Sequence, residues 1–157
     1  MRTELFVNGI LIEKEVSPER RLLDFLREDL GLKGTKKGCD QGECGACSIL
    51  LNGEVVNSCL VLMSQLTPRS EITTIESTDP LVTALQDSFV HNSASQCGIC
   101  TPGMIIAATA LLKDNPNAND EDIRQGLSGV LCRCTGYTKI IEAVKNTKIS
   151  YIEHEDL

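Results

Sequence analysis

The chain of 157 residues is 41% hydrophobic and 24% charged, a composition typical of a folded globular protein that excludes a disordered chain. A net charge of −7, with no basic run longer than the pairs Arg20-Arg21 and Lys36-Lys37, argues against nucleic acid as a partner. The N-terminus shows no apolar signal segment and the longest apolar run, 104–112, is too short to span a bilayer, so we expect a cytoplasmic protein with no membrane span.

Two β-hairpins are predicted in the first half of the chain. Strand-like runs flank Asn8-Gly9 over residues 4–16, and a second pair flanks Asn52-Gly53 over residues 49–56. Asn-Gly readily adopts the positive φ angles of a type I′ turn, which joins two antiparallel strands.

One helix and one further strand complete this half. Ser17-Pro18 provides an N-cap and a first helical residue, and apolar residues at helical spacing predict a helix over 18–30. The glycine-rich segment 33–47 has neither a helical nor a strand period and is predicted to be a loop around a bound group. A short strand is expected over 72–75, which gives a small mixed sheet with one packed helix.

The second half of the chain is predicted to be helical. At Asp79-Pro80 the pattern changes, so we place a domain boundary near residue 77, with domains over 1–77 and 78–157. The predicted helices span 80–91, 102–113, 120–127 and 137–146. These form a compact four-helix bundle, so the fold class is α+β with a separate all-α domain. The acidic, weakly patterned tail 147–157 is expected to be mobile.

Four cysteines in the first half form what we call the first cysteine set. Three stand in one loop at the spacing C-x4-C-x2-C and the fourth follows eleven residues later: Cys39, Cys44, Cys47 and Cys59. This spacing is typical of plant-type [2Fe-2S] sites, and glycines let backbone N–H groups turn toward an anionic cluster. Structural zinc sites more often use two short cysteine pairs, so an iron-sulfur cluster is favoured over zinc or disulfides.

The other four cysteines form the second cysteine set. They follow the pattern C-x2-C and then C-x-C: Cys97, Cys100, Cys132 and Cys134. Alone, this pattern fits zinc as well as iron. Thr101-Pro102 and Thr135-Gly136 follow two of these ligands at predicted helix starts, where unpaired N–H groups favour an anionic centre. In a reducing compartment, eight cysteines are more often metal ligands than disulfides.

Three motifs together resemble the small iron-sulfur subunit of the molybdenum hydroxylases. They are Gly-Cys-Asp-Gln-Gly-Glu-Cys-Gly-Ala-Cys over 38–47, Gln-Cys-Gly-Ile-Cys-Thr-Pro-Gly over 96–103 and Leu-Cys-Arg-Cys-Thr-Gly-Tyr over 131–137. That family includes xanthine dehydrogenase, aldehyde oxidoreductase, carbon monoxide dehydrogenase and nicotinate dehydrogenase. One departure is Val130, because many relatives carry Asn before the Leu-Cys-Arg-Cys run; it removes no ligand.

The resemblance implies a ferredoxin-like (β-grasp) domain followed by a four-helix domain, each holding one [2Fe-2S] cluster. It also implies a separate large subunit with the molybdopterin cofactor and a further subunit with FAD. Gln96 and Cys134 match the positions expected to hydrogen-bond the pterin, near the cluster of the second set.

The expected function is electron transfer within a molybdenum hydroxylase. Oxidation of a substrate C–H at molybdenum releases two electrons, and two one-electron clusters would pass them singly through the second set and then the first, toward the flavin. Nicotinate or xanthine are examples of the aza-heterocycle expected as substrate, bound on another chain. The alternatives are a free-standing two-cluster electron carrier and a zinc-binding structural protein.

Overall fold

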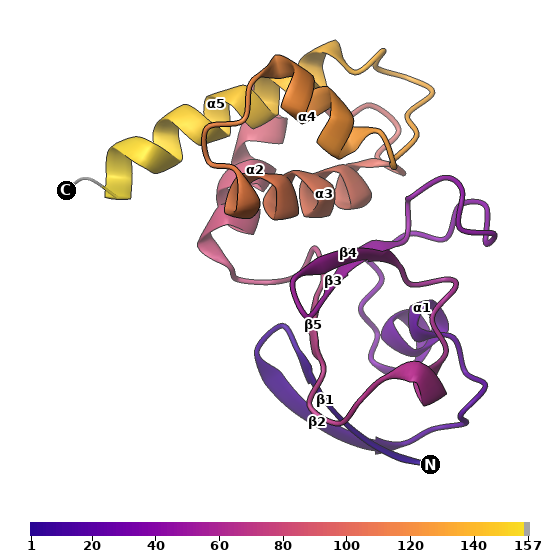
Figure 1. Cartoon of the computed structure of the whole chain (residues 1–157). Coiled ribbons are helices and arrows are strands. Elements are labelled where there is room, and N and C mark those ends of the chain that lie inside the picture. Colours follow the sequence, from indigo (N-terminus) through magenta and orange to yellow (C-terminus); the bar gives the residue numbers. More distant parts are fainter. Residues whose placement is uncertain (156–157) are drawn as a thin grey trace.

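The computed structural model describes the backbone of residues 1–155 and the side chains of residues 1–147. A twisted sheet with its loops forms one end of the molecule, and a layer of helices covers the other end (Figure 1). The mixed sheet and the helices that follow confirm the predicted α+β class. None of the helices in the described part is long and apolar enough to cross a bilayer.

The sheet has five strands in the order β2-β1-β5-β3-β4. The strands are β1 (Arg2–Val7), β2 (Ile10–Glu15), β3 (Ser48–Leu51), β4 (Glu54–Asn57) and β5 (Glu71–Thr73). Strands β1 and β5 pair in parallel, while the other pairs are antiparallel. Both Asn-Gly turns have positive φ at both residues, 51° and 79° in the first hairpin and 52° and 89° in the second. The two predicted type I′ hairpins are therefore confirmed.

The prediction of a helix over 18–30 was wrong in its extent. Helix α1 (Leu22–Asp24) begins four residues later and passes into the π-helical turn η1 (Phe25–Asp29). Residues 61–63, at the start of the 3-10 turn η2 (Met63–Gln65), hold the backbone at the beginning of α1. Leu22 N–H donates to the Val61 carbonyl at 2.8 Å, and Met63 N–H donates to the Arg20 carbonyl at 2.8 Å. These long-range bonds replace the first helical turn that Ser17-Pro18 predicts.

The helical domain contains α2 (Pro80–His91), α3 (Thr101–Asp114), α4 (Asp120–Leu127) and α5 (Thr138–Glu155). The first three match their predicted positions to within one residue. Asp79 caps α2 by accepting from the N–H groups of Leu81 and Val82, as the Asp79-Pro80 pattern predicts. The last helix continues to Glu155, so its predicted end at residue 146 was too early. The segment expected to be a mobile tail therefore belongs to α5 as far as Glu155, and residues 156–157 lie outside the described part.

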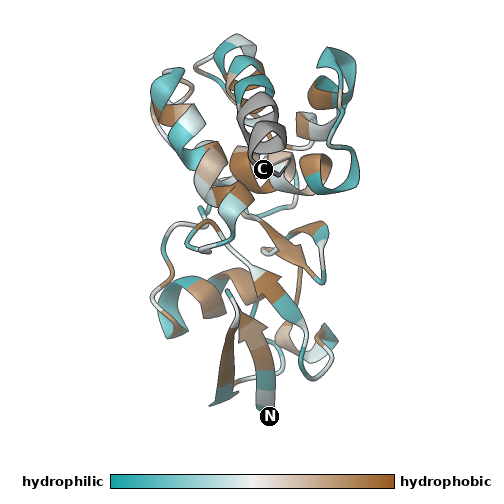
Figure 2. Cartoon of the chain, turned by 90° about the vertical axis from the view of Figure 1, so that its left-hand side faces the viewer, coloured by the Kyte–Doolittle hydropathy of each residue, from teal (hydrophilic) through white to brown (hydrophobic). Residues whose placement is uncertain are grey.

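Each half of the chain has its own apolar core. The sheet domain buries Leu5, Phe25 and Ile49 among others, and the helical domain buries Leu85, Phe89 and Met104. Figure 2 shows hydrophobic residues along the strands and where the helices meet the sheet, with hydrophilic residues on outer helical turns. Helix α3 lies against β3 and β4 and so joins the two halves. The predicted boundary near residue 77 falls between the end of β5 and the start of α2, and its exact residue stays a prediction.

Candidate metal centres

The first cysteine set is brought together by the loop before β3 and the end of the β3–β4 hairpin. The Cys39 and Cys44 side chains lie within hydrogen-bonding reach of each other, and Cys47 and Cys59 form a second such pair. Cys47 directly precedes β3 and Cys59 follows β4, so the hairpin fixes the second pair. The fold therefore assembles the four predicted residues as two pairs.

Backbone N–H groups converge on Cys39. The N–H groups of Gln41, Glu43 and Cys44 donate to its Sγ at 3.4, 3.3 and 3.3 Å, and its own N–H donates to the Cys44 Sγ at 3.3 Å. These donors, led by Cys44, lower the pKa of the Cys39 thiol to about 7. Positive φ angles at Asp40 (63°) and Gly42 (77°) turn the loop so that its N–H groups face inward.

The partner pair of this set is buried. Cys47 and Cys59 are 3% and 4% exposed and pack with Leu23 of α1. Burial raises the pKa of Cys47 to about 11. The Asn57 side-chain amide donates to the Gly42 carbonyl at 2.9 Å, which ties the ligand loop to the end of β4.

Ion pairs hold the other side of the same loop. Asp40, next to Cys39, pairs with Arg21 at 2.6 Å and with Lys37 at 3.2 Å. The Arg21 hydrogen bond is the main reason that the pKa of Asp40 is lowered. Arg21 also pairs with Asp24 of α1 at 2.7 Å, so the loop is fastened to the start of that helix.

The second cysteine set also forms two pairs, and these cross between its two motifs. Cys97 lies beside Cys134, and Cys100 lies beside Cys132. Cys97 and Cys134 are exposed, whereas Cys100 is 7% exposed. Thr101-Pro102 begins α3, as predicted, and Cys100 occupies the N-cap position. Burial raises the pKa of Cys100 to about 12.

The surroundings of Cys132 depart from the sequence prediction. Helix α5 begins at Thr138, so Thr135-Gly136 precedes it and does not form its first turn. Thr135 instead approaches the Cys132 Sγ with its Oγ1 at 3.2 Å and its N–H at 3.5 Å. Although burial alone would raise the pKa of Cys132, these hydrogen bonds lower it.

Tyr137 supports this turn from both sides. Its hydroxyl accepts from the Cys132 N–H at 3.0 Å and donates to the Val130 carbonyl at 3.3 Å. Val130, which the sequence marks as a departure from the family motif, is 2% exposed and belongs to the apolar core of the helical domain. The spacing of the cysteines did not reveal the roles of Thr135, Tyr137 and Asn57; their closeness to ligands in the chain was the only available signal.

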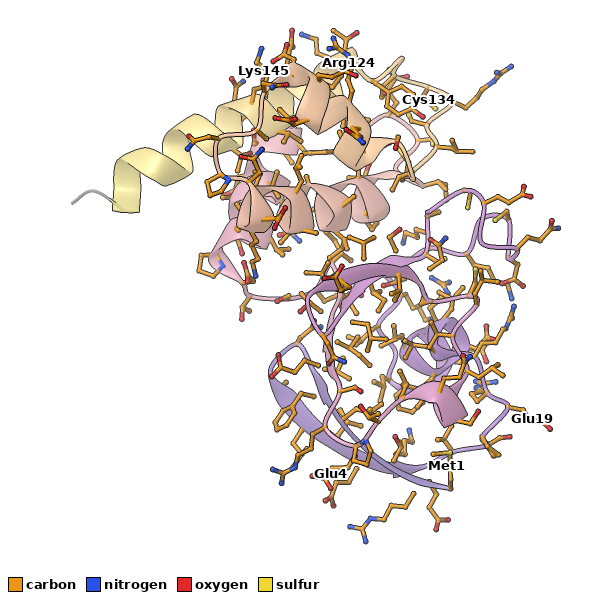
Figure 3. The ribbon with its side chains drawn as sticks, in the orientation of Figure 1. Met1, Glu4, Glu19, Arg124, Cys134 and Lys145 are labelled. Carbon is orange, nitrogen blue, oxygen red and sulfur yellow. The ribbon has the colours of Figure 1, made fainter. Side chains whose placement is uncertain are left out.

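Gln96 and Cys134 lie on one exposed surface. Gln96 is exposed directly before Cys97, whose side chain lies beside that of Cys134. Figure 3 shows Cys134 on the loop between α4 and α5, at the edge of the helical domain. Ile99 and Leu131, from the same two motifs, are 49% and 58% exposed.

Two thiol pairs per set suit a centre with two metal ions. In a [2Fe-2S] cluster four thiolates serve two irons, and hydrogen bonds to sulfur stabilise the negative charge of the cluster. The N–H groups on Cys39 and the Thr135 contacts to Cys132 supply such bonds. Among the residues that the structure describes, no three His, Cys, Asp or Glu side chains are arranged to hold a single metal ion.

The two cysteine sets meet at a direct backbone contact. The Leu131 N–H donates to the Cys44 carbonyl at 2.9 Å. Leu131 directly precedes Cys132, so this hydrogen bond connects a candidate ligand of the first set to the residue before a candidate ligand of the second.

Comparison with known families gives two adjacent matches. Residues 5–76 match the 2Fe-2S iron-sulfur cluster binding domain, and residues 72–145 match the [2Fe-2S] binding domain. The chain thus contains two [2Fe-2S]-binding domains.

Several relatives match over most of their length. The chain is 48% identical over 143 residues to the nicotinate dehydrogenase small FeS subunit of Eubacterium barkeri, with 90% of each chain covered. It is 46% identical to the nicotine 6-hydroxylase small subunit of Paenarthrobacter nicotinovorans, with 88% of this chain and 84% of that one covered. It is 45% identical to a probable xanthine dehydrogenase subunit of Bacillus subtilis, with 87% and 79% covered.

Solved structures show the same fold. Quinoline 2-oxidoreductase from Pseudomonas putida 86 aligns with a TM-score of 0.89 and 42% identity, over 99% of this chain and 96% of that one. The aldehyde oxidoreductase from Desulfovibrio desulfuricans aligns with a TM-score of 0.93 and 37% identity, over 97% of this chain. This chain spans only 17% of that longer protein.

Proposed function

The chain belongs to the family of small [2Fe-2S] subunits of the molybdenum hydroxylases, and we propose that it carries electrons within such an enzyme, from a molybdopterin site toward a flavin. The observation that supports this most directly is the arrangement of all eight cysteines as pairs on two adjoining domains. We assign one cluster to Cys39, Cys44, Cys47 and Cys59, and the other to Cys97, Cys100, Cys132 and Cys134.

Each [2Fe-2S] cluster takes up and releases one electron at a time. The residues of this chain supply the hydrogen bonds around the ligand sulfurs. The N–H groups on Cys39 and the Thr135 contacts to Cys132 favour added negative charge at sulfur. The hydrogen bond from Leu131 N–H to the Cys44 carbonyl connects the two sites. Because Leu131 is bonded to Cys132 in the chain, the path from Cys44 to Cys132 crosses only this one hydrogen bond.

The exposed surface of the second set is the proposed contact with the molybdopterin-binding subunit. Gln96 and Cys134 are both exposed there, so their polar atoms are available to hydrogen-bond a pterin held by another chain. Ile99 and Leu131 add exposed apolar area of the kind that protein interfaces bury.

The first set is the proposed outlet toward an FAD-binding subunit. Leu60, next to Cys59, is 57% exposed and offers apolar area at that end. We propose a cytoplasmic complex, because free thiols persist as metal ligands in a reducing compartment.

An aza-heterocycle is the proposed substrate of the whole enzyme, bound on a partner chain. Nicotinate, nicotine and xanthine in the relatives' names, and quinoline in that of a solved neighbour, are all nitrogen heterocycles. Assays of the purified complex with nicotinate, xanthine and a carbocyclic aldehyde would test this: turnover of the aldehyde alone would contradict it.

Elemental analysis tests the cluster assignment. We expect about four irons and four acid-labile sulfides per chain, the content of two [2Fe-2S] clusters. Zinc without sulfide would instead support the structural alternative. Native mass measurement separates the other alternative, because a free-standing carrier purifies as a monomer and the proposed subunit purifies with larger chains.

Cys134→Ser tests the assignment of ligands to the two sites. We expect it to change the EPR signal of one cluster and leave the other signal unaltered, because Cys134 and Cys39 belong to different sets. Cys39→Ser is the matched variant and should change the signal that Cys134→Ser leaves intact. If both variants changed the same signal, the assignment would be wrong.

A further inference from the structure

Backbone atoms of the two domains come close together at three glycines. A Cβ atom on Gly103, in the first turn of α3, would lie 2.4 Å from the Gly45 carbonyl oxygen. A Cβ atom on Gly45 would lie 2.2 Å from the Gly129 carbonyl oxygen and 2.9 Å from the Val130 Cα. Both distances are far below a normal van der Waals contact, so neither glycine can carry a side chain without displacing the backbone opposite.

This crossing lies beside candidate ligands of both sets. Gly45 follows Cys44 in the chain, and Gly103 lies three residues after Cys100. The hydrogen bond from Leu131 N–H to the Cys44 carbonyl runs alongside it at 2.9 Å. A shift of the backbone here therefore moves one cysteine set relative to the other.

Another part of the domain interface is packed less tightly. A cavity of about 230 Å³ lies between β3–β4 and the helices, with Val55, Ala107 and Gly129 in its lining. A Cβ atom on Gly129 would meet nothing within 4 Å. The close approach of Gly45 to Gly103 and to the Gly129–Val130 backbone is thus tight, whereas the interface beside it has room to adjust.

We propose that the backbone contact between Gly45 and Gly103 is a positioning device that sets the distance between the two clusters. The inference rests on the proposed two-cluster function and extends it. Electron transfer between two centres slows steeply as their separation grows, so glycine at these positions keeps the two sites as close as their backbones allow.

Gly103 is the position at which this role can be separated from helix formation. Its φ angle is not positive, and alanine favours a helix more than glycine does. Gly103→Ala therefore leaves α3 itself intact and acts on the contact with Gly45. Gly129→Ala is the matched control, because it adds the same methyl group at the same interface without a contact.

The experiment uses the complex purified with its partner subunits and fully reduced. It measures iron and labile sulfide per chain and the spin–spin splitting of the two cluster EPR signals at low temperature. This splitting falls with the third power of the distance between the spins. We expect a smaller splitting in Gly103→Ala with both clusters retained, and the unaltered splitting in Gly129→Ala. Val130→Ala adds no atom but removes the Cγ1 that lies 3.3 Å from the position of a Gly103 Cβ, beside the same contact, and should also change the splitting.

An unchanged splitting in a fully loaded Gly103→Ala complex would overturn this inference alone. Loss of a cluster in Gly103→Ala with an unchanged splitting in Val130→Ala would also overturn it, since the glycine would then hold a cluster and not a distance. Fewer than two clusters in the unaltered complex would instead overturn the proposed function, and this inference with it.

Discussion

Replacement of Thr135 by valine should lower the reduction potential of the cluster in the second set. The Thr135 Oγ1 accepts from the Tyr137 N–H at 3.1 Å, which leaves its own hydrogen to point at the Cys132 Sγ, 3.2 Å away. Valine has nearly the same shape but no hydroxyl. The change therefore removes one donor from a thiolate ligand with little change in packing.

The size of the effect follows from the charge that the hydrogen bond faces. A hydrogen bond to a charged group contributes about 1.5 to 3 kcal/mol, and only its increase on reduction moves the potential. If that increase is about 1 kcal/mol, the potential falls by about 40 mV, because a tenfold change in a one-electron equilibrium corresponds to about 59 mV.

A redox titration followed by EPR measures both clusters in one sample. The cluster of the first set is the internal reference, and Thr135→Ser, which keeps the hydroxyl, is the matched control. We expect the lower potential in Thr135→Val only, and only for the second set. An unchanged potential, or an equal fall in Thr135→Ser, would refute the role of this hydrogen bond.

Two further predictions concern how each domain is held. Asn57→Asp removes the donor to the Gly42 carbonyl, and the loss of this hydrogen bond costs about 1 kcal/mol. In the presence of a chelator, the EPR signal of the first-set cluster should therefore decay faster than that of the second-set cluster. Asn57→Gln keeps an amide donor and should make this difference in decay rate smaller. Asp79→Ala removes the N-cap of α2 and its ion pair with Lys113, and should lower the melting temperature by about 2 to 4 °C. Lys113→Ala should cost less, because that ion pair is partly exposed. Burial alone would raise the pKa of Asp79, yet Lys113 and the helix N–H groups lower it, so its contribution is full above about pH 4 and is lost as pH falls further. An Asp79→Ala deficit that persists at low pH would contradict this.

Local patterns in the sequence predicted most of the elements. The Asn8-Gly9 and Asn52-Gly53 turns depend on the φ preferences of their own two residues, and the Asp79 cap depends on hydrogen bonds within one helical turn. Such features need no knowledge of distant residues. The segment after Ser17-Pro18 also carries a good local helix signal, but its backbone bonds to residues 61–63, and this long-range pairing cannot be read from local preference.

The same limit applies to the candidate site. The spacing of the cysteines identified the two sets, and the fold gathers each of them. The spacing did not indicate which thiols lie together. Cys97 and Cys100 are near neighbours in the chain, but each lies beside a cysteine of the Cys132–Cys134 motif. Those pairs arise from the packing of the loop before α5 on the start of α3. The contact between Gly45 and Gly103 could not be predicted from the sequence either, because it depends on how the two domains pack together.

The distribution of hydrogen bonds on sulfur favours electron movement from the second set to the first. Cys39 accepts three backbone N–H groups, more than any other of the eight thiols in the described structure, whereas Cys132 accepts from the N–H groups of Thr135 and Cys134 and from the Thr135 hydroxyl. Donors to sulfur stabilise the reduced, more negative state of a cluster, so the first set should have the higher potential. In the proposed function, an electron that arrives at the exposed surface around Cys134 would then move downhill toward the loop at Cys39. The hydrogen bond from Leu131 N–H to the Cys44 carbonyl lies between these two ends and would give the proposed transfer a short path.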